Sequence, residues 1–73
     1  MQGELDLNFL GTHGHVAAVD KQTGAEHWRT SLPRGGFGLV SLLCEYGVLY
    51  AGAGGRLYAL DQRTGKILWE NGL

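Results

Sequence analysis

Two histidines are the first residues in this sequence whose type and spacing could do chemistry. His13 and His15 stand two positions apart, so on an extended strand both side chains would lie on one face. Imidazole nitrogens bind zinc, but a zinc site takes three or four ligands, and no acidic residue or cysteine stands at a matching spacing. We therefore interpret the pair as loop or strand-end residues and predict no metal site.

The nucleophilic side chains lack the partners that catalysis needs. Ser31 and Ser41 have no histidine or carboxylate at a spacing typical of a triad. Cys44 is the only cysteine, so no intrachain disulfide can form. The glycine-rich run 52–55 is not followed by a helix that could hold a phosphate at its N-terminus, and we interpret it as a turn. The sequence thus predicts no catalytic residue.

The composition points to an all-β protein. The chain has 73 residues, of which 13 are glycine and one is proline, and 44% are hydrophobic. Many glycines are typical of short strands joined by tight turns. A net charge of −1 offers no attraction for nucleic acid, and no apolar run is long enough for a transmembrane segment. The N-terminus lacks the features of a secretory signal, which leaves the cellular location unknown.

An internal repeat with an offset of 41 residues defines the organisation of the chain. A fixed period of this size is typical of repeat architectures such as propellers. The paired positions, which need no gap, are Glu4 and Glu45, Phe9 and Tyr50, Gly11 and Gly52, Gly14 and Gly55, Ala18 and Ala59, Asp20 and Asp61, Thr23 and Thr64, Gly24 and Gly65, Trp28 and Trp69, and Leu32 and Leu73. We divide the chain into a first repeat at 1–32, a linker at 33–37 and a second repeat at 38–73.

The sequence predicts seven strands, which must position the residues of the two repeats. Glycines interrupt every run that could form a helix, and short apolar runs are bounded by turn residues. The predicted strands are Leu5–Leu10, His15–Val19, Ala25–Thr30, Gly38–Cys44, Val48–Ala51, Arg56–Leu60 and Lys66–Glu70. The run Leu57–Leu60 does not alternate between apolar and polar residues, so we expect burial on both faces, as between stacked blades.

Both repeats share the pattern A-x-D-x-x-T-G-x-x-x-W, for which we predict a role in docking one blade on the next. The aspartate should accept backbone N–H groups of the following turn, and the glycine suits its left-handed position. The tryptophan, four residues later, could dock on the neighbouring blade and donate its indole N–H. The predicted docking residues are Ala18, Asp20, Thr23, Gly24 and Trp28, and Ala59, Asp61, Thr64, Gly65 and Trp69.

This pattern resembles the tryptophan-docking motif of the β-propeller repeats named after pyrroloquinoline quinone (PQQ), and the resemblance spans almost the whole chain. It implies two four-stranded antiparallel blades, the first incomplete. That family includes quinoprotein dehydrogenases, which bind PQQ with calcium, and non-enzymes such as an outer-membrane assembly lipoprotein and kinase-linked sensor domains. The resemblance implies a periplasmic or other extracytoplasmic location. Cys44 has no cysteine neighbour like the pair of the alcohol-oxidising enzymes, so we predict no cofactor, with PQQ and calcium implied only by the resemblance. Enzyme activity stays open, and a non-catalytic role is the favoured interpretation.

Two blades cannot close a propeller of roughly 4 to 8 blades. The first repeat lacks nine positions, the counterparts of Pro33–Ser41, which include most of an inner strand. We therefore expect either a homo-oligomer or a piece of a longer propeller, and we keep both alternatives open. Two further functions also stay open beside a non-catalytic scaffold that contacts proteins or ligands: a fragment of a PQQ-dependent dehydrogenase, and a sensor or outer-membrane assembly adaptor. The stretch Pro33–Gly38 could present Arg34 and Phe37 on a rim of the assembly, or be only a connector.

Overall fold

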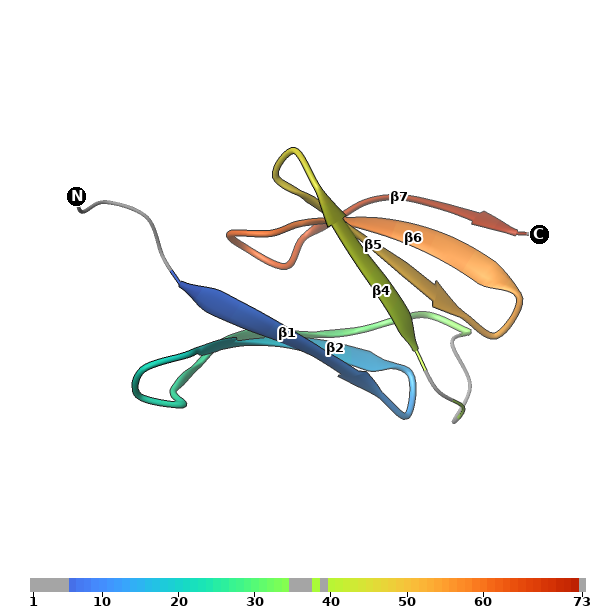
Figure 1. Ribbon diagram of the computed structural model, residues 1–73. Coiled ribbons are helices and arrows are strands. Elements are labelled where there is room, and N and C mark those ends of the chain that lie inside the picture. The colour runs from blue at the N-terminus through green and yellow to red at the C-terminus, as the bar shows by residue number, and fades with distance from the viewer. Residues whose placement is uncertain (1–5, 35–37, 39, 73) are drawn as a thin grey trace.

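Two antiparallel sheets make up the computed structural model, which describes residues 6–34, 38 and 40–72. The first sheet has the order β1-β2-β3, with β1 (Leu7–Thr12), β2 (His15–Asp20) and β3 (Glu26–Ser31). The second has the order β4-β5-β6-β7, with β4 (Ser41–Glu45), β5 (Val48–Ala53), β6 (Arg56–Asp61) and β7 (Ile67–Gly72). Figure 1 shows the sheets as two layers. The all-β prediction is confirmed, with two antiparallel sheets that match incomplete propeller blades.

The repeat in the sequence is also a repeat in the structure. Adding 41 to the bounds of β1, β2 and β3 gives the bounds of β5, β6 and β7. Each repeat has a β-bulge at the same place, between Ala18 and Val19 and between Ala59 and Leu60. The counterpart of β4 would fall at the start of the chain, outside the described residues. The described parts of the two blades therefore have the same strands in the same register.

Tight two-residue turns join β1 to β2, β4 to β5 and β5 to β6, whereas five-residue turns join β2 to β3 and β6 to β7. His13 and Gly14 have φ of 51° and 76°, and Tyr46 and Gly47 have φ of 50° and 79°. Positive φ at both central residues is the mark of a type I′ turn, whose twist fits the twist of the flanking strands. These turns let the first strand of each hairpin run to the turn itself, so β1 ends at Thr12 and not at the predicted Leu10.

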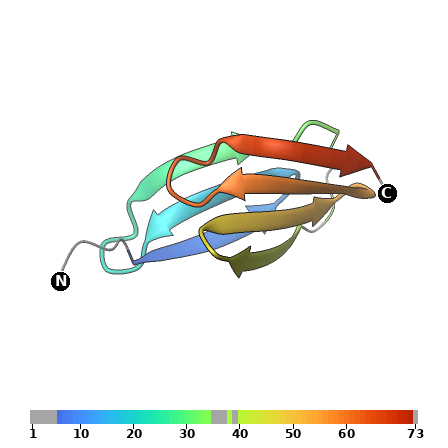
Figure 2. The same ribbon diagram turned by 90° about the horizontal axis from the view of Figure 1, so that it is seen from above.

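The core lies between the two sheets and is shared by both repeats. Figure 2, which looks down on the layers, shows the strands of one sheet overlying those of the other. The buried cluster consists of Val16, Leu32, Leu49, Ala51, Ala53, Tyr58 and Leu60. Tyr58, Ala59 and Leu60 are 0% exposed, whereas Leu57 is only partly buried, so the predicted burial on both faces holds for three of the four residues. Among the described residues, the core is therefore shared between the two repeats.

Some strand boundaries differ from the predictions. β4 begins at Ser41, three residues after the predicted Gly38, and β7 extends to Gly72. The predicted linker 33–37 falls partly outside the described residues, which include Pro33 and Arg34 but not Phe37. The hydroxyl of Tyr58 donates to the carbonyl oxygen of Pro33, which ties the end of the first repeat to the second sheet. The described residues contain no helix long and apolar enough to cross a membrane.

Candidate blade-docking site

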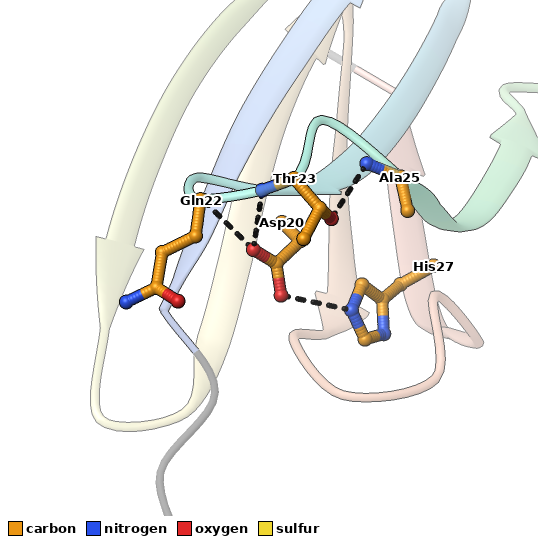
Figure 3. A network of polar contacts seen from close by, with 5 residues as sticks. All are labelled: Asp20, Gln22, Thr23, Ala25 and His27. Carbon is orange, nitrogen blue, oxygen red and sulfur yellow. Dashed lines mark hydrogen bonds and ion pairs between the residues drawn. The ribbon is translucent and has the colours of Figure 1, made fainter.

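The turn after β2 is held by the side chains of the shared pattern. Asp20 Oδ1 accepts the backbone N–H groups of Gln22 at 2.7 Å and Thr23 at 3.1 Å (Figure 3). Thr23 Oγ1 accepts the N–H of Ala25 at 3.2 Å. The N–H groups of Thr23 and Gln22 stabilise the carboxylate and hold the pKa of Asp20 below its usual 3.8. His27 Nε2 lies 3.8 Å from Asp20 Oδ2, a contact that becomes an ion pair when the imidazole is protonated.

The turn after β6 repeats this geometry. Asp61 Oδ1 accepts the N–H groups of Arg63 at 2.7 Å and Thr64 at 3.3 Å, and Thr64 Oγ1 accepts the N–H of Lys66 at 3.2 Å. Gly24 and Gly65 both have φ of 78°, a left-handed conformation that glycine adopts without strain. The two turns are thus built alike, and any difference in what covers them comes from their neighbours.

The turn of the second repeat is covered by Trp28 of the first. Trp28 Nε1 donates to the carbonyl oxygen of Gln62 at 3.0 Å, and its ring lies on Gly65. A methyl group on Gly65 would stand only 2.5 Å from Trp28 Cδ2, so no larger residue fits beneath the ring. The ring also packs against Phe9, with 6.0 Å between the ring centres. β3 therefore contributes an aromatic side chain that packs on, and hydrogen-bonds to, the next sheet.

A second contact beside the tryptophan was not predicted from the sequence. Thr30 Oγ1 donates to the carbonyl oxygen of Gly65 at 2.6 Å, on the same face of β3 as Trp28. The comparison of the two repeats does not reveal this contact, because Asn71 stands at the position equivalent to Thr30.

A third feature is the close approach of β1 to the chain before β4: a Cβ on Gly11 would be 2.8 Å from Val40 Cβ. Gly11 was in the repeat alignment, but nothing in the sequence gave it this role.

The equivalent groups on the outer faces of the two sheets are exposed. Trp69 is 46% exposed, and its ring lies beside that of Tyr50, with 6.2 Å between ring centres. Gly24 has no atom within 4 Å of the position of a Cβ, whereas Gly65 is buried. The structure therefore brings Trp28 together with the second turn and leaves Trp69 and the first turn apart, on opposite outer faces.

The other candidate residues form no site in the part of the chain that the structure describes. His13 lies in the turn before β2 and not on a strand, and His15 Nδ1 is 2.9 Å from the carbonyl oxygen of His13. Both residues line one hollow on the outer face of the first sheet. No group of three or more His, Cys, Asp or Glu side chains that could hold a metal occurs among the described residues. Partial burial raises the pKa of the Cys44 thiol, which disfavours the reactive thiolate.

These residues do not fit PQQ with calcium. Calcium takes six to eight oxygen ligands, several of them carboxylates. Two aspartates, Asp6 and Asp61, line an open pocket of 390 Å³ between the sheets, but Asp61 Oδ1 is engaged by its own turn. Asp6 pairs with Lys21 at 3.4 Å. The two carboxylates that line this pocket are therefore engaged in a turn and in an ion pair, and we derive no chemistry through a cofactor.

Comparison with known families agrees with this structural description. The family model described as outer membrane protein assembly factor BamB, a PQQ-type repeat model, matches residues 12–73. A search among curated proteins gave no match. The matched range includes both aspartate turns and both tryptophans, and it covers most of the chain. The chain therefore belongs to the BamB family of PQQ-type repeats, as the resemblance predicted.

Proposed function

We propose that this chain is a non-catalytic β-propeller repeat module whose function is to bind protein, and whose outer faces are covered by further blades. The observation that carries the proposal is the contrast between two equivalent tryptophans. Trp28 packs on the turn of the next repeat, whereas Trp69 is 46% exposed. In repeat proteins each unit contacts its neighbours through equivalent surfaces, so an exposed Trp69 indicates that a further blade covers it.

The burial pattern supports the same proposal. The buried cluster draws on both sheets, so each sheet depends on a neighbour for its core. Large hydrophobic side chains are exposed on the outer faces, with Leu10 at 51% and Leu43 at 63%. Exposed apolar groups of this kind are typical of interaction surfaces. The family's description as an assembly factor also supports binding of protein rather than catalysis.

A tandem chain tests whether further blades complete the module. Two copies of the sequence joined by the nine residues Pro33–Ser41 restore the 41-residue period across the junction. If blades stabilise one another, the tandem chain should unfold at a higher temperature and denaturant midpoint than the single chain, in one cooperative transition. A control tandem joined by nine Gly and Ser residues keeps the length of the junction but replaces its sequence, including Ser41, the first residue of β4. Equal stability of the single and tandem chains would overturn the proposal.

The enzyme alternative is tested separately. A fragment of a quinoprotein dehydrogenase should bind PQQ saturably in the presence of calcium. We expect no saturable binding by titration calorimetry for either the single or the tandem chain. Saturable binding would replace the scaffold proposal with the dehydrogenase alternative.

A further inference from the structure

The outer face of the second sheet presents a set of side chains that we call the tryptophan face: Leu43, Tyr50, Leu57, Trp69 and Asn71. Cross-strand pairing places them together, because Leu43 pairs with Tyr50, and Asn71 pairs with Leu57. Adding 41 to Phe9, Val16, Trp28 and Thr30 gives four of these five positions. Those four residues pack in the shared core or hydrogen-bond to the turn of the second sheet. The tryptophan face is thus an exposed copy of an interface already present in the molecule.

The outer face of the first sheet is the counterpart, and we call it the receiving face: Asn8, Leu10, Ala17, Val19 and Glu26. These positions are equivalent to Leu49, Ala51, Tyr58, Leu60 and Ile67, with which the second sheet packs against the first. Beside them stands the turn Asp20–Gly24, identical in its hydrogen bonds to the turn that Trp28 covers. The two faces lie on opposite outer sides of the molecule (Figure 1).

We propose that the tryptophan face of one molecule docks on the receiving face of a second copy of this chain. The proposal rests on the proposed function and names the partner. By equivalence with Trp28 and Gln62, Trp69 Nε1 donates to the backbone carbonyl of Lys21 in the second copy. By equivalence with Thr30, the side-chain amide of Asn71 donates to the carbonyl oxygen of Gly24. The ring of Trp69 then lies on Gly24, where no described atom stands within 4 Å of a Cβ position.

The sizes of the side chains on the receiving face fit this occupant. In the interface within the chain, Ala51 and Tyr58 form a cross-strand pair of one small and one large residue. On the receiving face the equivalent pair is Leu10 and Ala17, again one large and one small residue with the sizes exchanged. A hollow of 450 Å³ lies there, lined by Leu10, Ala17 and Val19 and by the polar residues His13, His15, Glu26 and Arg29. Such an exchange keeps much of the packed volume, and substitutions that conserve volume are tolerated better than others.

Both faces of the proposed interface are more polar than their equivalents in the interface within the chain. Phe9 and Ile67 both pack against the core in the interface within the chain. Their equivalents in the proposed interface are Tyr50 and Glu26, so two apolar residues become a phenol donor and a carboxylate acceptor. Thr30 likewise becomes Asn71. An interface between separate molecules must also be soluble before it forms, and such interfaces carry more polar groups than a core does.

This contact joins unlike faces, so it is heterologous. Each copy docks one face and still offers the other, which produces a closed ring if the rotation closes and an open stack if it does not. Three or four copies of a two-blade unit would supply six or eight blades, within the range of propellers. A second kind of partner, a different protein on either face, is an outcome that the experiment below distinguishes.

Two variants, each altered on one face, test the docking. Trp69→Ala removes the ring from the tryptophan face, and Leu10→Glu places a charge on the receiving face at a position that is 51% exposed. The mass of each chain is measured by light scattering and sedimentation over a range of concentrations. The wild-type chain should form a multiple of 7.9 kDa, and each variant alone should stay at 7.9 kDa. Circular dichroism verifies that both variants keep their strands.

The mixture of the two variants decides the result. Each retains one intact face, so together they should form a 1:1 pair of about 15.8 kDa, twice 7.9 kDa, and nothing larger. If the wild type associates but the mixed variants do not pair, the heterologous contact is wrong, while stabilisation in the tandem chain would still support the module. If the wild type is monomeric at every concentration, self-docking is wrong, and the tandem chain again decides the proposed function on its own. A variant that loses its strands is replaced by Asn71→Ala or Ala17→Glu on the same face.

Discussion

Trp28 donates its indole N–H to the carbonyl oxygen of Gln62 at 3.0 Å, across 34 positions of sequence. This single bond joins a strand of the first repeat to a turn of the second. Its equivalent in the second repeat, from Trp69, has no acceptor among the described residues. The molecule therefore contains one complete contact between blades, that of Trp28 with the second turn. The equivalent groups, Trp69 and the first turn, do not contact each other.

Replacing the two tryptophans should affect different properties. Trp28→Ala removes a ring packed between the sheets together with its hydrogen bond, and we expect a loss of about 3 kcal/mol in the free energy of unfolding. Trp69→Ala removes a ring that is 46% exposed, so its cost in dilute solution should be about 1 kcal/mol or less. Denaturant unfolding at low protein concentration measures both. Equal losses would contradict the difference in packing.

The two turn glycines offer a matched comparison. Gly24→Ala and Gly65→Ala both place a Cβ at φ of 78°, which costs roughly 1–2 kcal/mol in each case. Gly65→Ala should also displace Trp28 and cost about 1–3 kcal/mol more. The difference between the two free energies of unfolding thus isolates the contact with the ring. No difference would mean that the ring moves aside freely.

The close approach of Gly11 to Val40 can be tested in the same way. Neither Gly11 nor Gly52 has a positive φ, so alanine causes no backbone strain at either position. Gly11→Ala would place its Cβ 2.8 Å from Val40 Cβ, and we expect destabilisation of about 1–3 kcal/mol. Gly52→Ala meets only Ser41 Cβ at 3.9 Å and should be neutral or slightly stabilising. Thermal unfolding of the pair measures the cost of this approach.

Much of the fold could be predicted because it repeats. The 41-residue offset located three strands of each repeat, and glycines in the turns marked the starts of β2, β5 and β6. The missed ends of β1 and β4 precede the turns at His13 and Tyr46, non-glycine residues with positive φ that composition does not reveal. The contact between Thr30 and Gly65 was missed because it depends on which face of β3 meets the second sheet. That choice is made by tertiary packing over 35 positions of sequence. The docking role of the shared pattern stays a prediction.

The acid sensitivity of the first turn should depend on Asp20. Backbone N–H groups of Thr23 and Gln22 lower the pKa of this carboxyl in the folded state below its unfolded value. Its contribution to stability is therefore complete above the unfolded pKa, near 4, and is lost as the pH falls through the lower folded pKa. Asp20→Asn keeps an oxygen that accepts both N–H groups but does not titrate, so it should flatten the fall in melting temperature below pH 4. Asp20→Ala, which removes the acceptor, should lower the melting temperature at pH 7 as well. A steep acid transition unchanged in Asp20→Asn would assign the sensitivity to other carboxylates.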